Sequence, residues 1–481
     1  MEKSRLLKLL RSLSKEELRG LKKFVRNPFF NQRSEVPTLL DVLEKSLKTG
    51  RDLPDKEQAY RQIFARRLKD EQALESKSAA PFDDHRVRMA MSFLYQLAGQ
   101  YLAVKAFLDD PAQFQRCLAS IYRKRNLPEQ FAKTCDEAIA AQARQPLRDA
   151  AFFEENYQIL LEKHRFAVES QNFENLDFQE LSDRLDHAFL ARKLWQACFM
   201  LAHQSVSKAN YQFGLLDAVL AHIEQTNALE IPAISIYYHC YRALTNPAEK
   251  THFQQFKTLL MQHGELFPAE ELRDLYILAI NFCIRQYNAG NQDYLAEQFE
   301  LYREGFAKKY FLTDGTLSRY TYQNAATIGL VMHELEWVET FIHEYRPTLK
   351  EEHRESLFSF NLARLEYQRR DLGKALQLLQ KAEYKELMLS LAAKTLQLKI
   401  FYELQEFDLL ESHLQAIRAF IRRKNMARYQ LENYLNTVNF TQKLLETNLF
   451  DKEAKLALRR EIEMTKALAE KEWLLRMMND E

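Results

Sequence analysis

Glycine and proline are scarce in this chain of 481 residues, which has ten of the first and eleven of the second. So little of either leaves few places for tight hairpin turns. No proline lies between Pro146 and Pro232, and none follows Pro347. The glycines are scattered singly, so the sequence has no glycine-rich loop of the kind that holds phosphate groups. Long helices are therefore the expected structure.

Long apolar runs and closely spaced cysteines are also missing. No stretch approaches the roughly 20 apolar residues needed to span a bilayer, and the first residues lack the apolar core of a signal peptide. We therefore expect a cytoplasmic protein with no membrane segment. The cysteines have no metal-knuckle spacing, which predicts buried free thiols in a reducing compartment. They are Cys117, Cys135, Cys198, Cys240 and Cys283.

Catalytic and metal-binding motifs are missing too. The sequence has no G-x-S-x-G nucleophile elbow, and its twelve histidines include no H-x-x-x-H pair. His333-Glu334 lacks the second histidine of a zinc protease. We therefore expect a protein that is not an enzyme and that holds no cofactor or metal. An enzyme whose site is assembled from dispersed residues is one alternative.

What is present indicates a folded, all-α chain. Hydrophobic residues make up 46% of the sequence and charged residues 28%, which is typical of globular proteins. Turn residues interrupt the chain at intervals that suit helices of about 12–20 residues. No alternation of apolar and polar residues predicts a sheet.

A fixed step of 35 residues separates Trp337, Leu372 and Phe407. Each of them follows an acidic residue directly. A repeat of about this length in a chain poor in glycine and proline is typical of stacked helical hairpins. The sequence therefore predicts an α-α superhelix, and such arrays usually bind other proteins.

The segment 361–376 resembles a tetratricopeptide repeat. Leu362 and Ala363 stand where that family places its first-helix leucine and small residue, and Ala375 and Ala382 stand where its second helix needs small residues. The clear resemblance covers about residues 320–425. It implies a solenoid that binds a peptide or partner segment in a groove lined by the first helix of each hairpin.

Carried over position by position, the resemblance implies a set of groove residues. Arg364 and Lys399 occupy equivalent places one repeat apart, and with an amide they could hold a carboxylate. Ala326 and Leu396 stand where the family has further groove asparagines. The alternative is that the two cations are only solvated surface charges. The candidates are Phe360, Asn361, Arg364, Gln368 and Lys399.

The N-terminal residues form a basic module. Residues 1–70 hold 18 Lys and Arg against 10 Asp and Glu, a net charge of +8, whereas the remaining residues have a net charge of −7. Ser14 and Glu17 form a capping box that opens a helix, and Asn27-Pro28 ends it. The stretch 13–31 resembles the start of an uncharacterised family of bacterial helical-repeat proteins, which implies no activity.

Lys15, Arg19, Lys22 and Arg26 recur every three or four positions along this helix, which would place them on one stripe. Arg11 precedes the Ser14 cap, so it joins the stripe only if the flanking turn places it there. Such a stripe favours contact with nucleic acid phosphates, an acidic partner or the body of the protein itself. An amphipathic helix with a solvated charged face is the simpler alternative. The stripe consists of Arg11, Lys15, Arg19, Lys22 and Arg26.

These patterns predict four parts and a function. The parts are a basic helical module at 1–75, degenerate helical hairpins at 84–319, tetratricopeptide-like repeats at 320–450 and a C-terminal capping helix at 451–481. The predicted function is a non-catalytic scaffold that binds a peptide or protein segment in a groove. Nucleic-acid binding or regulation through the basic module is the alternative.

Overall fold

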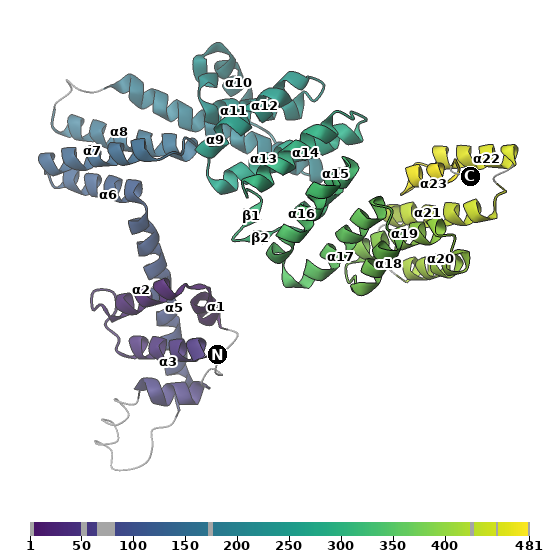
Figure 1. The fold of residues 1–481 in the computed structure, drawn as a ribbon. Helices are drawn as coiled ribbons and strands as arrows, with labels where there is room; N and C mark the ends of the chain where they lie inside the picture. The colour runs from purple at the N-terminus through teal and green to yellow at the C-terminus, as the bar shows by residue number, and fades with distance from the viewer. Residues whose placement is uncertain are drawn as a thin grey trace. The chain divides into compact units, whose positions relative to one another are not determined.

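The computed structural model describes residues 4–49, 55–64, 82–171, 177–423, 428–448 and 451–479. Helices make up most of these ranges, and the all-α prediction is confirmed (Figure 1). The one sheet in the described ranges is a hairpin of β1 (Leu312–Thr313) and β2 (Thr316–Leu317). The sequence predicts no strand there, because two residues on each side are too few for an alternating pattern.

The chain divides into two compact units, Met1–Phe189 and Leu190–Glu481. The bounds of four parts expected from the sequence stay a prediction. The boundary expected between the first two of these parts, at 75–84, lies mostly outside the described residues. The helices of the first unit are α1 (Arg5–Ser12), α2 (Lys15–Arg26), α3 (Glu35–Thr49), a helix described at 56–64, α5 (Asp84–Asp109), α6 (Pro111–Lys124), α7 (Pro128–Arg144), α8 (Ala150–Glu169) and the start of α9 (Phe178–Val206).

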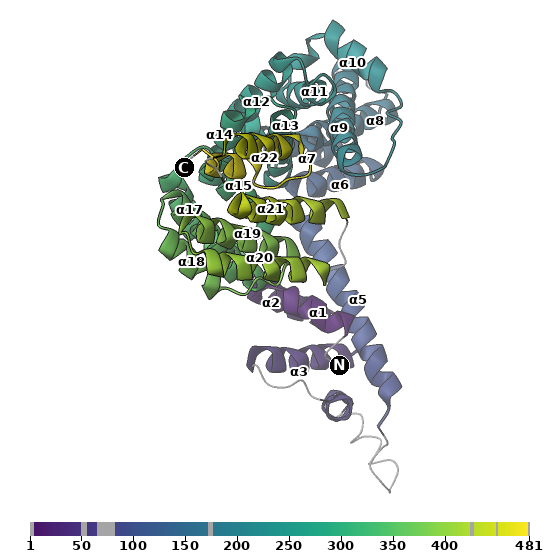
Figure 2. The same ribbon diagram turned by 90° about the vertical axis from the view of Figure 1, so that its right-hand side faces the viewer.

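The second unit contains the rest of α9 and a series of helices that follow it (Figures 1 and 2). Short 3-10 helices lie at Asn227–Glu230, Gly264–Leu266 and Arg346–Thr348. The α-helices are α10 (Leu216–Gln225), α11 (Pro232–Thr245), α12 (Lys250–His263), α13 (Ala269–Asn288), α14 (Tyr294–Ala307), α15 (Arg319–Val331), α16 (Leu335–Tyr345), α17 (Glu351–Gln368), α18 (Leu372–Lys381), α19 (Leu387–Glu403), α20 (Phe407–Arg422), α21 (Arg428–Glu446), α22 (Lys452–Met464) and α23 (Lys471–Met477).

The start of α2 follows directly from its sequence. The Ser14 side chain accepts a hydrogen bond from the Glu17 N–H, and the Glu17 carboxylate accepts one from the Ser14 N–H. Leu18 and Leu21 then enter a core that α5 completes with residues such as Leu94. The expected capping box is therefore present, and the basic N-terminal helices share their core with α5.

Four hairpins of the second unit close with the same turn. The residue at the turn has a positive φ, as at His333, Arg370 and Gln405. The N–H of the next residue then bonds the carbonyl five residues earlier, which satisfies a carbonyl at the end of the helix. We call that next residue the turn residue of its hairpin. The turn residues are Asn291, Glu334, Asp371 and Glu406.

Counting from the turn residues corrects the repeat step. Successive turn residues are 43, 37 and 35 residues apart. The step of 35 holds from Leu372 to Phe407, but the residue equivalent to them is Leu335 and not Trp337. The 35-residue alignment is therefore shifted by two residues in the hairpin of α15 and α16.

This count also shows which first-helix residues are equivalent. Seven residues before their turn residues stand Ile284, Thr327, Arg364 and Lys399. Ten residues before them stand Asn281, Asn324, Asn361 and Leu396. We call the surface formed by the exposed and half-buried members of these two rows the first-helix face.

The C-terminal end is built differently from the expected single helix. Residues 451–479 form α22 and α23, with a break at 465–470. Figures 1 and 2 both show α21 beside α19 and α20. Trp473 and Leu474 of α23 enter a core that α19 and α21 share. The array is thus closed by a bent pair of helices.

The five cysteines are free thiols. Four of them are buried, as expected, but Cys117 is exposed because it lies on the solvent side of α6. Their compartment stays a prediction.

Two helical glycines have opposite surroundings, and we expect opposite effects when each is replaced by alanine. A Cβ at Gly329 would lie 2.5 Å from the Val338 Cγ2 atom and 3.1 Å from the Trp337 ring. Overpacking of this kind costs about 1–3 kcal/mol, which exceeds the ~1 kcal/mol of helix propensity that alanine gains. Gly99 of α5 has open space around its Cα. Thermal unfolding should show Gly329→Ala destabilised and Gly99→Ala stabilised by about 0.5–1 kcal/mol; a stabilised Gly329→Ala would contradict the close contact.

Candidate functional site

A cavity of about 500 Å³ opens on the first-helix face of the second unit. Its size falls in the range of ligand-binding pockets. Three consecutive first helices, α15, α17 and α19, supply most of its wall, and α21 and the residues before α23 complete it. We call it the Arg364 cavity. Its lining includes Asn324, Thr327, Phe360, Arg364, Gln368, Thr395, Lys399, Tyr434 and Glu470.

Arg364 is the cation of this cavity that has no bonded acid. Its Nη1 atom donates to Thr327 Oγ1 at 2.8 Å and lies 3.5 Å from Asn361 Oδ1. Among the described residues, no carboxylate lies within ion-pair distance of its guanidinium. Burial lowers the pKa of Arg364 to about 10, with the charge of Glu470 acting in the opposite direction. The side chain therefore stays charged at neutral pH and can accept an anion.

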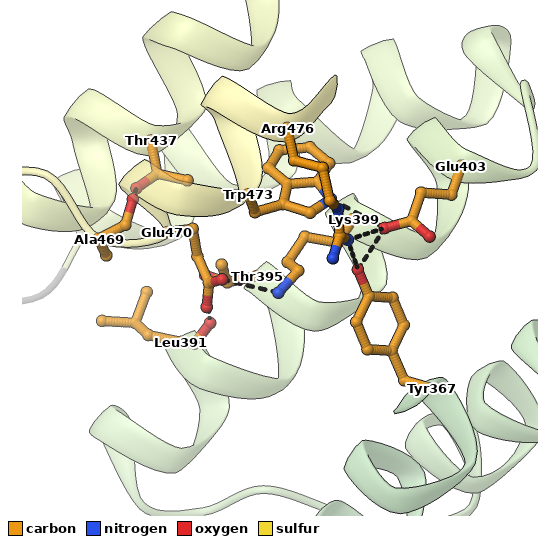
Figure 3. A network of polar contacts seen from close by, with 10 residues as sticks. All are labelled: Tyr367, Leu391, Thr395, Lys399, Glu403, Thr437, Ala469, Glu470, Trp473 and Arg476. Carbon is orange, nitrogen blue, oxygen red and sulfur yellow. Dashed lines mark hydrogen bonds and ion pairs between the residues drawn. The ribbon is translucent and has the colours of Figure 1, made fainter. Parts of the chain in front are cut away.

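Lys399 has an acid partner inside the protein. Its Nζ atom lies 2.7 Å from Glu470 Oε2, and it stands 4.9 Å from the centre of the Tyr367 ring (Figure 3). Glu470 itself has φ 59° and ψ 28°, in the left-handed region that non-glycine residues seldom adopt. The chain thus holds a carboxylate at the cavity wall despite a backbone conformation that costs energy.

The residues that carry Glu470 are fixed to α21. The Thr437 hydroxyl donates to the Ala469 carbonyl at 2.6 Å, as Figure 3 shows. The Asn436 Nδ2 group donates to the Ala467 carbonyl at 2.8 Å. These bonds satisfy carbonyls in the break between α22 and α23. The wall formed by the C-terminal segment is therefore anchored to α21 just before Glu470.

Glu403 joins α17, α19 and α23 behind Lys399. Its carboxylate accepts hydrogen bonds from the Tyr367 hydroxyl and, at 2.8 Å, from the Trp473 indole N–H (Figure 3). Arg370 and Arg476 also contact it, at 2.6 Å and 3.4 Å. The Glu403 side chain is only 5% exposed. A buried carboxylate with four donors is a structural centre that holds α23 in place.

The five groove candidates from the sequence have different positions. Phe360, Arg364, Gln368 and Lys399 all line the Arg364 cavity. Asn361 does not, because it is fully buried and its Nδ2 group donates to the Leu357 carbonyl at 2.9 Å. Its Oδ1 atom accepts a long hydrogen bond of 3.5 Å from Arg364 Nη1. The buried Oε1 atom of Gln368 has no hydrogen-bond partner among the described residues.

Other cavity residues were missed by the sequence alignment. The 35-residue step aligns Ala326 with Asn361, and Ala326 is buried. The turn count places Asn324 there, and Asn324 is exposed and lines the cavity. Tyr434 and Glu470 come from segments outside the clear repeats, where no repeat signal could identify them.

The basic stripe of the first unit is partly neutralised. Lys22 lies 3.0 Å from the Asp41 carboxylate and also contacts Glu44, and these bonds raise its pKa. Arg26 lies 2.7 Å from Asp41. Two of the five stripe residues are therefore bound to α3 of the same unit. The other three, Arg11, Lys15 and Arg19, are exposed.

Comparisons with known proteins add no assignment. No family model matches the chain, and no curated protein is significantly similar to it. The resemblances to tetratricopeptide repeats and to bacterial helical-repeat proteins therefore stay predictions. Within the described ranges, none of the helices combines the length and the apolar character needed to cross a membrane.

Proposed function

We propose that this protein is a non-catalytic scaffold that binds an acidic segment of a partner protein at the Arg364 cavity. The observation that carries the proposal is a charged arginine in a pocket without a bonded acid. Burying a cation costs free energy unless an anion compensates it. A ligand carboxylate at Arg364 would supply that compensation and gain charge-assisted hydrogen bonds.

The surroundings of Arg364 support a peptide ligand. Exposed Asn324 and half-buried Gln368 offer amide groups that can pair with a peptide backbone. Phe360 offers an apolar surface beside the guanidinium, whose centre lies 5.7 Å from the ring. Lys399 is already paired with Glu470, so Arg364 is the position at which a new anion gains most.

Nucleic-acid binding through the basic stripe has less support. Lys22 and Arg26 are bound to acids of the same unit, which lowers the charge left for phosphates. A gel shift by the full chain at low salt that weakens as salt rises would favour this alternative.

Replacement of Arg364 by glutamine should weaken partner capture about 10- to 100-fold, the usual effect of losing a charged hydrogen-bonded contact. The change keeps much of the side-chain volume and removes the charge. The measurement is quantitative mass spectrometry of proteins recovered with the tagged full chain after crosslinking in native cells.

The matched control is Arg303→Gln, because Arg303 is exposed on α14 and does not line the cavity. It removes the same charge and should leave recovery unchanged. Equal recovery by the wild type and Arg364→Gln would count against the cavity as the binding site. The failure of crosslinked wild type to recover any partner would count against the scaffold itself.

A further inference from the structure

A second cavity, of about 460 Å³, lies between α9 and α13 in the same unit. Its wall is mainly apolar, and Val206 at the end of α9 is 84% exposed. Arg285 is the one permanently charged side chain in the lining. We call it the Arg285 cavity, and it is lined by Phe199, Ala202, His203, Ser205, Val206, Leu278, Asn281, Ile284 and Arg285.

Arg285 is in the same situation as Arg364. Its Nη1 atom donates a long hydrogen bond of 3.4 Å to Ser205 Oγ. Within the described ranges, no carboxylate lies at ion-pair distance from its guanidinium. Burial lowers the pKa of Arg285, with the Cys240 thiol acting in the opposite direction. The neighbouring His203 is engaged elsewhere, since its Nδ1 atom lies 2.7 Å from the Tyr211 hydroxyl.

The turn count places this cavity on the first-helix face. Asn281 and Ile284 line the Arg285 cavity, and they stand ten and seven residues before the turn residue Asn291. Asn324 and Thr327 hold the same two positions on α15 and line the Arg364 cavity. The two cavities are therefore formed by equivalent surfaces of consecutive first helices.

We infer that the Arg285 cavity is a second acid-binding subsite for the segment that binds at Arg364. This inference rests on the proposed function and specifies its ligand: an extended segment with two separated acidic residues. The acid at the Arg285 cavity should stand beside a large apolar residue, because Phe199, Leu278 and Ile284 line the same cavity as Arg285. A carboxylate there would give Arg285 the anion that its own protein does not supply.

The experiment is a selection from a phage-displayed library of random peptides on the immobilised full chain. We expect the wild type to enrich peptides with acidic residues at two positions. Arg285→Gln should abolish enrichment at the position next to the apolar residue, and Arg364→Gln should abolish it at the other. An enriched peptide with a fluorescent label should bind Arg285→Gln about 10- to 100-fold more weakly in anisotropy titrations.

Arg285→Lys keeps the charge without the planar fork and should give an intermediate affinity, and it also serves if Arg285→Gln proves poorly folded. Arg303→Gln is again the charge-matched control. Enrichment of a single acidic position that depends on Arg364 alone would overturn this inference and leave the proposed function standing. Acidic enrichment that is absent, or that depends on neither arginine, would overturn both.

Discussion

Replacement of Glu403 by leucine is expected to lower the free energy of unfolding of the second unit by about 3 kcal/mol, the cost of removing one partner from a buried ion pair. The leucine would leave the Tyr367 hydroxyl and the Trp473 indole N–H without their acceptor. Each unsatisfied buried donor costs about 1–3 kcal/mol. Glu403 joins α17, α19 and α23. We therefore expect unfolding of the leucine variant to begin with the release of α23.

Urea unfolding followed by circular dichroism measures this loss. Glu403→Gln keeps a carbonyl acceptor and should lose less than the leucine variant. Glu406→Gln is the matched control, because Glu406 is exposed three residues further on and should change stability by less than about 0.5 kcal/mol. Similar midpoints for Glu403→Gln and Glu406→Gln would show that the buried carboxylate is not a structural centre.

Replacement of Phe253 by alanine is expected to cost about 3–5 kcal/mol, which is the usual range for a buried phenylalanine. Phe253 of α12 is fully buried. Its ring stacks on Phe282 with centroids 4.7 Å apart and meets the edge of Tyr294 at 5.4 Å. The cavity left by the ring would open between α12, α13 and α14, and these helices could close it only by moving toward one another.

Phe407→Ala is the control for this change, because Phe407 is 46% exposed. The substitution removes the same atoms but changes the buried area less. Its expected loss is below about 1.5 kcal/mol. Both variants can be measured in the same urea titration. A loss for Phe253→Ala no larger than that for Phe407→Ala would mean that the first ring is not packed as described.

The helical architecture could be predicted because its causes are local. The few glycines and prolines and the capping box at Ser14 act within one or two turns of helix. The repeat step was harder to place. His333, Arg370 and Gln405 occupy the left-handed turn positions, so no glycine marks them in the sequence. Without that signal, the sequence pattern aligns Trp337 with Leu372, although the residue equivalent to Leu372 in that hairpin is Leu335.

The candidate site could be predicted only where it follows the repeat. Arg364 and Lys399 hold equivalent positions on consecutive first helices, and both line the cavity. Glu470 lies 71 residues after Lys399, and only the packing of the C-terminal helices decides that the two meet. The sequence therefore indicated two similar cations, whereas in the structure one is paired and the other is not.

The position of Trp473 allows the C-terminal helix α23 to be followed by fluorescence separately from the rest of the chain. Its indole is 4% exposed, and its N–H is bonded to a carboxylate. The chain has three tryptophans, and Trp195 and Trp337 lie on other helices. A variant that keeps Trp473 alone would shift its fluorescence emission to the red when α23 leaves its site. Optical spectroscopy could then separate release of the last helix from unfolding of the array, and it could follow that release while a ligand binds.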